Sequence, residues 1–142
     1  MCGIAGIVAN SEVSGSLYWA LYALQHRGQE SGGISTYDNG IVHKYKGYGL
    51  VSEIFTSSIL EKLSGKTGLG HVRYPTTGGS KTENIQPFNF LFRGHSLSIV
   101  HNGNLVNTDE LRYEYEGRGH IFSTTSDTEV IAAILANEII HG

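Results

Sequence analysis

Apolar positions in the first part of the chain follow two different spacings. Residues 3–9 (GIAGIVA) form a short uncharged apolar run, which predicts a buried strand. Over residues 14–25, three leucines recur at three- and four-residue spacing, which predicts a helix. Gly28 follows this segment as a stop signal. A strand that begins at residue 3 would hold the N-terminus of the chain rigidly.

The next part of the chain predicts a β-hairpin. Residues 33–37 and 41–46 flank an Asp-Asn-Gly sequence at 38–40, and an Asn-Gly pair between two such runs is a strong signal for a tight turn. The patterns that follow predict a short helix over residues 56–63 and further strands over residues 67–74 and 95–101.

The second half of the chain predicts a long loop and two helices. Residues 76–87 show no periodicity and are rich in small polar residues, which is typical of a functional loop. Asn107 and Ser126 are each followed three residues later by a glutamate, a capping-box pattern. We therefore expect one helix to open at Asn107 and another to span residues 127–140. Together these elements predict a mixed α+β domain with largely antiparallel sheet.

The composition excludes several kinds of partner and setting. A formal charge of −3 gives no electrostatic reason to expect nucleic acid or an anionic membrane as partner. No apolar run approaches the roughly 20 residues of a membrane span, and the N-terminus lacks the pattern of a secretion signal. A single cysteine cannot form an internal disulfide, and no carboxylate or thiolate cluster accompanies the histidines. We expect a cytoplasmic protein without a metal ion or cofactor.

Cys2 is the only cysteine in the chain and directly follows Met1. If Met1 is removed, this residue presents a thiol and a free α-amine, groups whose ordinary pKa values of about 8.5 and about 8 suit proton exchange. The amine can take the thiol proton, and the thiolate can then attack a carbonyl carbon. A lone cysteine is more often a small buried apolar group, so the residue by itself leaves both interpretations open.

Four further segments contain residues suited to this chemistry: HRGQES at 26–31, GHVRY at 70–74, HNGN at 101–104 and TTSDTE at 124–129. Each also has a structural explanation. An Asn-Gly pair after a strand, as at Asn102-Gly103, is typical of a hairpin turn. Asp127 suits the dipole at a helix start, and Arg73 suits a surface ion pair.

The same residues, taken together, match a site for a free amino acid that carries a side-chain amide. A thiolate that attacks an amide needs donors where the carbonyl oxygen becomes negative, and the Asn102 amide and the Gly103 N–H can supply two. Arg73 has the planar fork that suits an α-carboxylate, and Asp127 suits an α-ammonium. The residues leave the choice between glutamine and asparagine open, because one methylene separates the two.

The opening Met-Cys-Gly-Ile and the four segments cover nearly the whole chain. On these residues the chain resembles the class II glutamine amidotransferase domains, which are N-terminal nucleophile hydrolases. The resemblance implies an αββα sandwich of antiparallel sheets and glutamine as the substrate. HRGQES and GHVRYPTTGG most resemble the branch of the family that supplies ammonia to phosphoribosyl pyrophosphate in purine biosynthesis.

The resemblance also implies the catalytic roles. Cys2 would be the nucleophile, with its own α-amine as general base and acid. Asn102 and Gly103 would form the oxyanion hole, and Arg27 would lie beside the nucleophile and position the terminus. The reaction would pass through a glutamyl thioester and release ammonia and then glutamate.

Binding roles follow from the same resemblance. Arg73 would bind the α-carboxylate of glutamine, and Asp127 would bind its α-ammonium. Tyr74 and Thr76 would belong to a segment, residues 73–86, that closes over the substrate.

The resemblance further bears on domain organisation. Residues 1–142 are expected to form one glutaminase domain, truncated so that it lacks later strands of the second sheet. No segment resembles a phosphoribosyl pyrophosphate loop, so the phosphoribosyltransferase domain is expected to be absent. The expected partners are L-glutamine and a synthase domain or subunit that accepts the ammonia, and a homo-oligomer is left open.

Two alternatives stand beside this interpretation. One is a non-catalytic scaffold or regulatory module of the same fold, and the other is a glutaminase domain that feeds a different acceptor. Activity would also require removal of Met1, because a retained Met1 leaves the thiol without an adjacent free amine.

Overall fold

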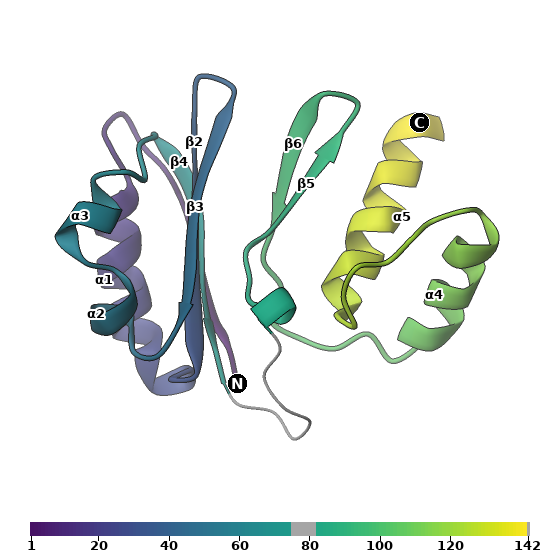
Figure 1. Ribbon diagram of the computed structural model, residues 1–142, viewed down its shortest axis with the longest axis horizontal. Coiled ribbons are helices and arrows are strands. Elements are labelled where there is room, and N and C mark those ends of the chain that lie inside the picture. The colour runs from purple at the N-terminus through teal and green to yellow at the C-terminus, as the bar shows by residue number, and fades with distance from the viewer. Residues whose placement is uncertain (75–81, 142) are drawn as a thin grey trace. The chain divides into compact units, whose positions relative to one another are not determined.

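The computed structural model of the chain describes residues 1–74 and 82–141. The contacts between residues divide the chain into two compact units, Met1–Asn102 and Gly103–Gly142. The second unit contains α4 (Thr108–Gly117) and α5 (Asp127–His141). Figure 1 labels the elements along the chain. The first unit contains β1 (Gly3–Val8), α1 (Ser14–Leu24), the 3-10 helix η1 (Gln25–Arg27), β2 (Ser31–Asp38), β3 (Ile41–Tyr48), α2 (Val51–Ile54), α3 (Ser57–Leu60), β4 (Thr67–Arg73), the 3-10 helix η2 (Thr82–Asn84), β5 (Phe88–Phe92) and β6 (His95–Ile99).

Two antiparallel sheets form the framework of the first unit (Figure 1). Four strands lie in the order β1-β4-β2-β3, and β5 pairs with β6 in a separate sheet. Every strand pair among the described residues is antiparallel. Asn39 and Gly40 join β2 to β3 with φ values of 46° and 88°, the positive values that a type I′ turn requires. The predicted antiparallel sheet and hairpin are therefore confirmed.

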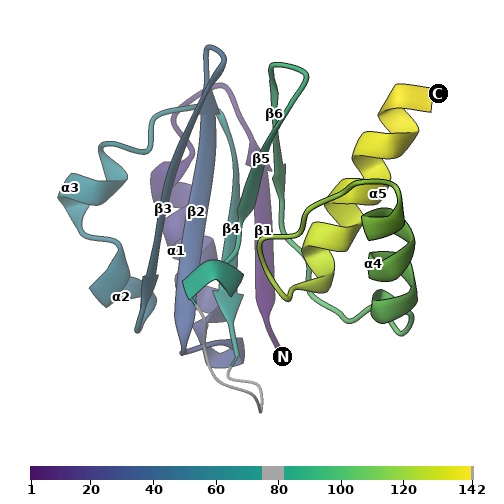
Figure 2. The same ribbon diagram turned by 45° about the vertical axis from the view of Figure 1, so that its right-hand side comes forward.

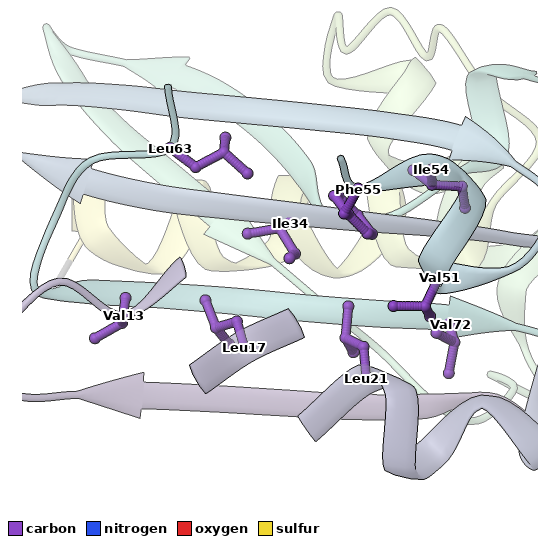
Figure 3. Close-up of a cluster of buried hydrophobic side chains, with 9 residues drawn as sticks. All are labelled: Val13, Leu17, Leu21, Ile34, Val51, Ile54, Phe55, Leu63 and Val72. Carbon is purple, nitrogen blue, oxygen red and sulfur yellow. The ribbon is translucent and has the colours of Figure 1, made fainter. Parts of the chain in front are cut away.

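Helix α1 packs on the four-stranded sheet through two leucines that face glycines. Leu17 and Leu21 are fully buried. A Cβ atom at Gly68 of β4 would lie 2.7 Å from Leu17 Cδ1, and one at Gly70 would lie 3.0 Å from Leu21. The helix can approach the sheet closely because these two positions lack side chains. Figure 3 shows the core cluster to which the leucines belong: Val13, Leu17, Leu21, Ile34, Val51, Ile54, Phe55, Leu63 and Val72.

The segment 85–90 lies against the other face of the four-stranded sheet, on the side away from α1 (Figures 1 and 2). Lys46 Nζ donates a 2.8 Å hydrogen bond to the Ile85 carbonyl, and Ser35 Oγ donates a 2.6 Å bond to Asn89 Oδ1. A Cβ atom at Gly33 would lie only 2.1 Å from the carbonyl oxygen of Gln86. A helix layer, the four-stranded sheet and the β5–β6 sheet are therefore stacked in that order within this unit.

Two predicted features differ from the structure in the first unit. The helix expected over residues 56–63 is a single turn, α3, and another single turn, α2, comes before it. Strand β5 was not predicted at all. Its sequence, FNFLF, directly follows the predicted loop without a turn signal, and its strand form depends on pairing with β6.

Neither of the two capping boxes predicted for the second unit forms completely. Asn107 precedes α4 without a side-chain capping hydrogen bond, so the first prediction is wrong. Before α5, Ser126 Oγ accepts a 3.2 Å bond from the Thr128 N–H, as an N-cap residue does. The Glu129 carboxylate binds the preceding turn instead of completing the box.

Candidate active site

Cys2 is a half-buried free cysteine at the start of β1, which is an edge strand of the four-stranded sheet. The first residue of that strand, Gly3, is paired with Val72 of β4. In an antiparallel ladder the next residues outward, Cys2 and Arg73, therefore lie at the same end of neighbouring strands. The sheet register thus brings the predicted nucleophile close to the predicted carboxylate-binding residue.

Two side chains from distant parts of the first unit converge on the backbone carbonyl of Cys2. Asn102 Nδ2 donates a hydrogen bond to this oxygen at 2.8 Å, and Arg27 Nε donates one at 3.3 Å. Arg27 Nη2 also lies 3.9 Å from the sulfur of Met1. The convergence fixes the backbone at Cys2 and puts an amide donor and a guanidinium beside this residue.

Arg73 is held in place by a carboxylate and a carbonyl. Its Nε lies 3.6 Å from Glu30 Oε2, and its Nη1 donates a 3.3 Å bond to the Asn84 carbonyl. The Arg73 and Glu30 side chains are only 16% and 12% exposed, so the pair is not the surface ion pair that the sequence left open. Sequence reasoning gave Glu30 no role, although it lies within the HRGQES segment.

Gly28 lies where the HRGQES segment passes close to the end of β4. A Cβ atom at this position would lie 2.6 Å from the backbone carbon of Arg73. Only glycine therefore lets the chain after η1 pass so close to the end of β4. The close approach brings Glu30 to the point where its N–H donates a 3.2 Å bond to the Arg73 carbonyl.

The Asn102-Gly103 pair is not a hairpin turn. Strand β6 ends at Ile99, and the next regular element is helix α4. The segment is anchored just before Asn102, where the His101 N–H donates a 2.6 Å bond to Gln86 Oε1. Gln86 is buried and was not singled out by the sequence as a positioning side chain.

Asp127 lies in the second unit, at the first residue of α5. Its Oδ2 accepts a 2.8 Å hydrogen bond from the Leu105 N–H. Leu105 directly follows HNGN, so within this unit the carboxylate is tied to the chain that continues from the Asn-Gly pair. The contact holds Asp127 in one orientation relative to that segment.

Two more predicted residues belong to the segment after β4. Tyr74 directly follows β4 and is 49% exposed. Thr76 lies outside the described residues, as does most of the segment predicted to close over the substrate.

The buried His71 and the half-buried Lys46 lie on the face of the sheet that the segment 85–90 covers. Burial lowers the pKa of His71 to about 4, and the positive charge of Arg73 acts in the same direction. Burial lowers the pKa of Lys46 to about 8, with a smaller contribution from Lys44. His71 is therefore neutral near pH 7, and Lys46 is charged in most molecules.

Two structural features are not found within residues 1–74 and 82–141. No helix there has both the length and the apolar character needed to cross a membrane. No three histidine, cysteine, aspartate or glutamate side chains come together there as a metal site requires.

Comparison with protein families gives one match that covers more than half of the chain. Residues 58–138 match a family model described as a glutamine amidotransferase domain. The matched range includes Arg73, Asn102 and Asp127 and does not include Cys2.

The chain is also similar to curated proteins named amidophosphoribosyltransferase. It is 49% identical to the Methanocaldococcus jannaschii protein over 99% of this chain and 30% of that protein. It is 45% identical to the Bacillus subtilis protein over 94% of this chain and 28% of that protein. The chain thus spans about 30% of the length of these relatives.

Two solved structures have a closely similar fold. One is described as the allosteric regulatory enzyme of purine biosynthesis; it has a TM-score of 0.86 and 44% identity over 93% of this chain and 28% of its own. The other is glutamine phosphoribosylpyrophosphate amidotransferase from Bacillus subtilis, complexed with ADP and GMP. It has a TM-score of 0.84 and 42% identity over 94% of this chain and 28% of its own.

Proposed function

The chain belongs to the glutamine amidotransferase family, and on that premise we propose that it cleaves the side-chain amide of L-glutamine with Cys2 as the nucleophile. The observation that carries the proposal is the pair of donors, Asn102 Nδ2 and Arg27 Nε, on the carbonyl of Cys2. They hold a free thiol at the start of a strand, where removal of Met1 would create a reactive terminus.

The reaction begins when the α-amine of Cys2 takes the thiol proton. The thiolate attacks the carboxamide carbon of glutamine, and the carbonyl oxygen becomes negative. The Asn102 amide and the Gly103 N–H stabilise that oxyanion. The protonated amine then gives its proton to the leaving nitrogen, so that ammonia departs and a thioester remains. Water, deprotonated by the same amine, attacks the thioester and releases glutamate with the thiol restored.

Substrate binding uses two charged side chains. Arg73 binds the α-carboxylate, and its ion pair with Glu30 supports this role by limiting the positions of the guanidinium. Asp127 binds the α-ammonium, supported by the Leu105 N–H that orients its carboxylate. Tyr74, which directly follows β4, contacts the bound amino acid in this proposal.

The ammonia is delivered to phosphoribosyl pyrophosphate on a phosphoribosyltransferase domain or subunit. The names of the relatives support this acceptor, since the proteins similar to this chain over nearly its whole length are amidophosphoribosyltransferases. Residues 1–142 serve as the glutaminase domain in this arrangement.

Intact-mass analysis with a diazoketone analogue of glutamine tests the catalytic proposal. The expected result is loss of Met1 followed by one adduct, on Cys2. Untreated protein should form glutamate from glutamine, and the treated protein should not. A Cys2→Ala variant, which retains the small second residue needed for Met1 removal, should take no adduct. Folded protein that has lost Met1 and neither reacts nor hydrolyses glutamine, even with a synthase partner supplied, would favour the non-catalytic module instead.

The acceptor is tested separately, with the proposed phosphoribosyltransferase domain or subunit present. Phosphoribosyl pyrophosphate should increase glutamate formation from glutamine, whereas a hexose phosphate should not. Stimulation by the hexose phosphate alone would assign the domain to a different acceptor.

A further inference from the structure

An arginine of α4 binds backbone carbonyl groups of the turn that precedes α5. Arg112 Nη1 donates a hydrogen bond to the Thr124 carbonyl and Nη2 donates one to the Ser126 carbonyl, each at 3.1 Å. The same guanidinium lies 4.4 Å from the centre of the Phe122 ring. One planar group therefore connects three positions of a single turn.

A carboxylate of α5 binds backbone N–H groups of the same turn. Glu129 Oε1 accepts a 2.9 Å bond from the Ser123 N–H, and Oε2 accepts bonds from the N–H and hydroxyl of Thr124 at 2.7 and 2.8 Å. Thr124 Oγ1 in turn accepts a 3.1 Å bond from the Ser126 N–H. The turn is thus bound from both sides within the second unit.

This turn ends at Asp127. The Ser126 carbonyl that accepts from Arg112 belongs to the peptide bond that joins Ser126 to Asp127. A displacement of that peptide plane rotates the Cα–Cβ bond of Asp127 and so moves the carboxylate away from the Leu105 N–H. By holding the Ser126 carbonyl, Arg112 can therefore set the direction of the Asp127 side chain through the backbone.

We propose that Arg112 is a positioning residue that sets the Asp127 carboxylate for the α-ammonium of the substrate, an inference that rests on the proposed function. Arginine suits the role because its planar fork reaches two carbonyls at once with fixed geometry. A lysine at this position has a single ammonium group on a flexible stem and cannot reproduce that fork.

The first test compares two competitive ligands of the glutamine-hydrolysing protein, with the proposed phosphoribosyltransferase domain or subunit present. L-Glutamate has an α-ammonium, and glutarate is the same diacid without it. In an Arg112→Met variant, the inhibition constant of L-glutamate and the KM for glutamine should rise about tenfold, as expected for lost hydrogen bonds from a charged donor. The inhibition constant of glutarate and kcat should stay within about twofold. Arg112→Lys should recover little of the loss.

Arg118 supplies the matched control. It lies at the end of the same helix, pairs with Glu114 and covers the Tyr115 ring, with a side chain that is 50% exposed. Arg118→Met removes the arginine at the C-cap of α4, which makes no hydrogen bond to the turn before α5 among the residues that the structure describes. The glutamine KM and the inhibition constants of both diacids should match those of the wild-type protein.

A double-mutant cycle separates positioning from general damage. In an Asp127→Asn background, Arg112→Met should change the glutamine KM by less than about twofold, because the group that Arg112 positions is already lost. Equal weakening of L-glutamate and glutarate, or effects that multiply in the double variant, would overturn the inference and leave Arg112 as a structural residue. Wild-type protein that does not hydrolyse glutamine would overturn the proposed function and this inference with it.

Discussion

Asn102 and Cys2, separated by 100 positions in the sequence, are joined by a 2.8 Å hydrogen bond from the Asn102 side-chain amide to the Cys2 carbonyl. An amide nitrogen carries two N–H donors. One N–H can therefore hold the Cys2 backbone while the other remains available for the oxygen of a substrate amide, as the proposed function requires. The bond joins the proposed oxyanion donor to the proposed nucleophile.

Replacing Asn102 should reduce the rate of catalysis rather than substrate binding. In Asn102→Ala, kcat for glutamine hydrolysis should fall by roughly 10²–10³, as is typical for loss of an oxyanion-hole donor. The glutamine KM should change only a few-fold. Steady-state kinetics, with single-turnover measurement of the thioester, check this result.

Asn104→Ala is the matched control for that variant. Asn104 belongs to the same HNGN segment, and its side chain is exposed. It should retain nearly full kcat. Equal losses in both variants would mean that Asn102 acts on the shape of the segment and not on the oxyanion.

Glu30→Gln should lower the free energy of unfolding by about 2–3 kcal/mol, because it leaves the Arg73 guanidinium partly buried without its carboxylate. Urea unfolding at pH 7 measures the change. Glu114→Gln is the control, since the Glu114–Arg118 pair is 50% exposed on both sides. Its effect should be about 0.5 kcal/mol or less. Similar values for the two variants would show that the Glu30–Arg73 pair is no stronger than a surface pair.

Asp127→Asn should weaken glutamine binding more than it weakens the fold. The amide oxygen of asparagine can still accept from the Leu105 N–H, but it has no charge for an α-ammonium. The glutamine KM should rise about tenfold or more, while the unfolding free energy falls by about 1 kcal/mol at most, the range of helix-dipole effects. Asp109→Asn in the first turn of α4 should change only stability. A wild-type glutamine KM in Asp127→Asn would leave this carboxylate with a structural role alone.

Gly33→Ala should be strongly destabilising. Its Cβ atom would lie 2.1 Å from the Gln86 carbonyl oxygen and 2.8 Å from Pro87 Cδ, so either the sheet or the segment 85–90 must move. A loss of several kcal/mol, about the size of a severe overpacking effect, should appear in thermal or urea unfolding. Gly15→Ala in α1 has no atom within 4 Å of the new Cβ and should be neutral or stabilising by up to about 1 kcal/mol. Equal stability of the two variants would contradict the close packing of the segment on β2.

Acid should destabilise the protein through His71. Its folded pKa of about 4 lies below the ordinary 6.5, so between these values the unfolded chain binds more protons. The stability that neutral His71 contributes is present above pH 6.5 and is lost as the pH falls toward 4. The 2.5-unit interval corresponds to about 3 kcal/mol.

Unfolding at pH 7 and pH 4.5 compares wild-type protein with His71→Asn. The variant should lose about 2–3 kcal/mol less than the wild type across this interval. His26→Gln, at an exposed position, should follow the wild type. The same acid sensitivity in His71→Asn as in the wild type would assign the effect to other groups.

Much of the fold followed from local patterns in the sequence. Strand β1, helix α1 and the β2–β3 hairpin were predicted to within a few residues, because apolar spacing and the Asn-Gly turn act between near neighbours. The burial predicted for β1 was wrong, since Ile4 is 45% and Val8 is 82% exposed in this edge strand. Local patterns were insufficient in two places: the helix expected over residues 56–63 is a single turn, and β5 was not predicted. One- or two-turn helices and five-residue strands depend more on what packs against them than on their own propensity.

The candidate site was likewise predicted in part from the sequence, and in part it became visible only in the tertiary structure. By itself the sequence determined which residue types are present: a second-position cysteine, an arginine after a strand, an Asn-Gly pair and an aspartate at a helix start. Only the tertiary structure decided that Glu30 pairs with Arg73, and that Gln86 anchors the backbone beside Asn102. It likewise decided that Arg112 holds the turn before Asp127. The physical reason is distance along the chain: periodicity and turn chemistry report on neighbours, whereas these contacts join side chains that meet only when strands and helices pack.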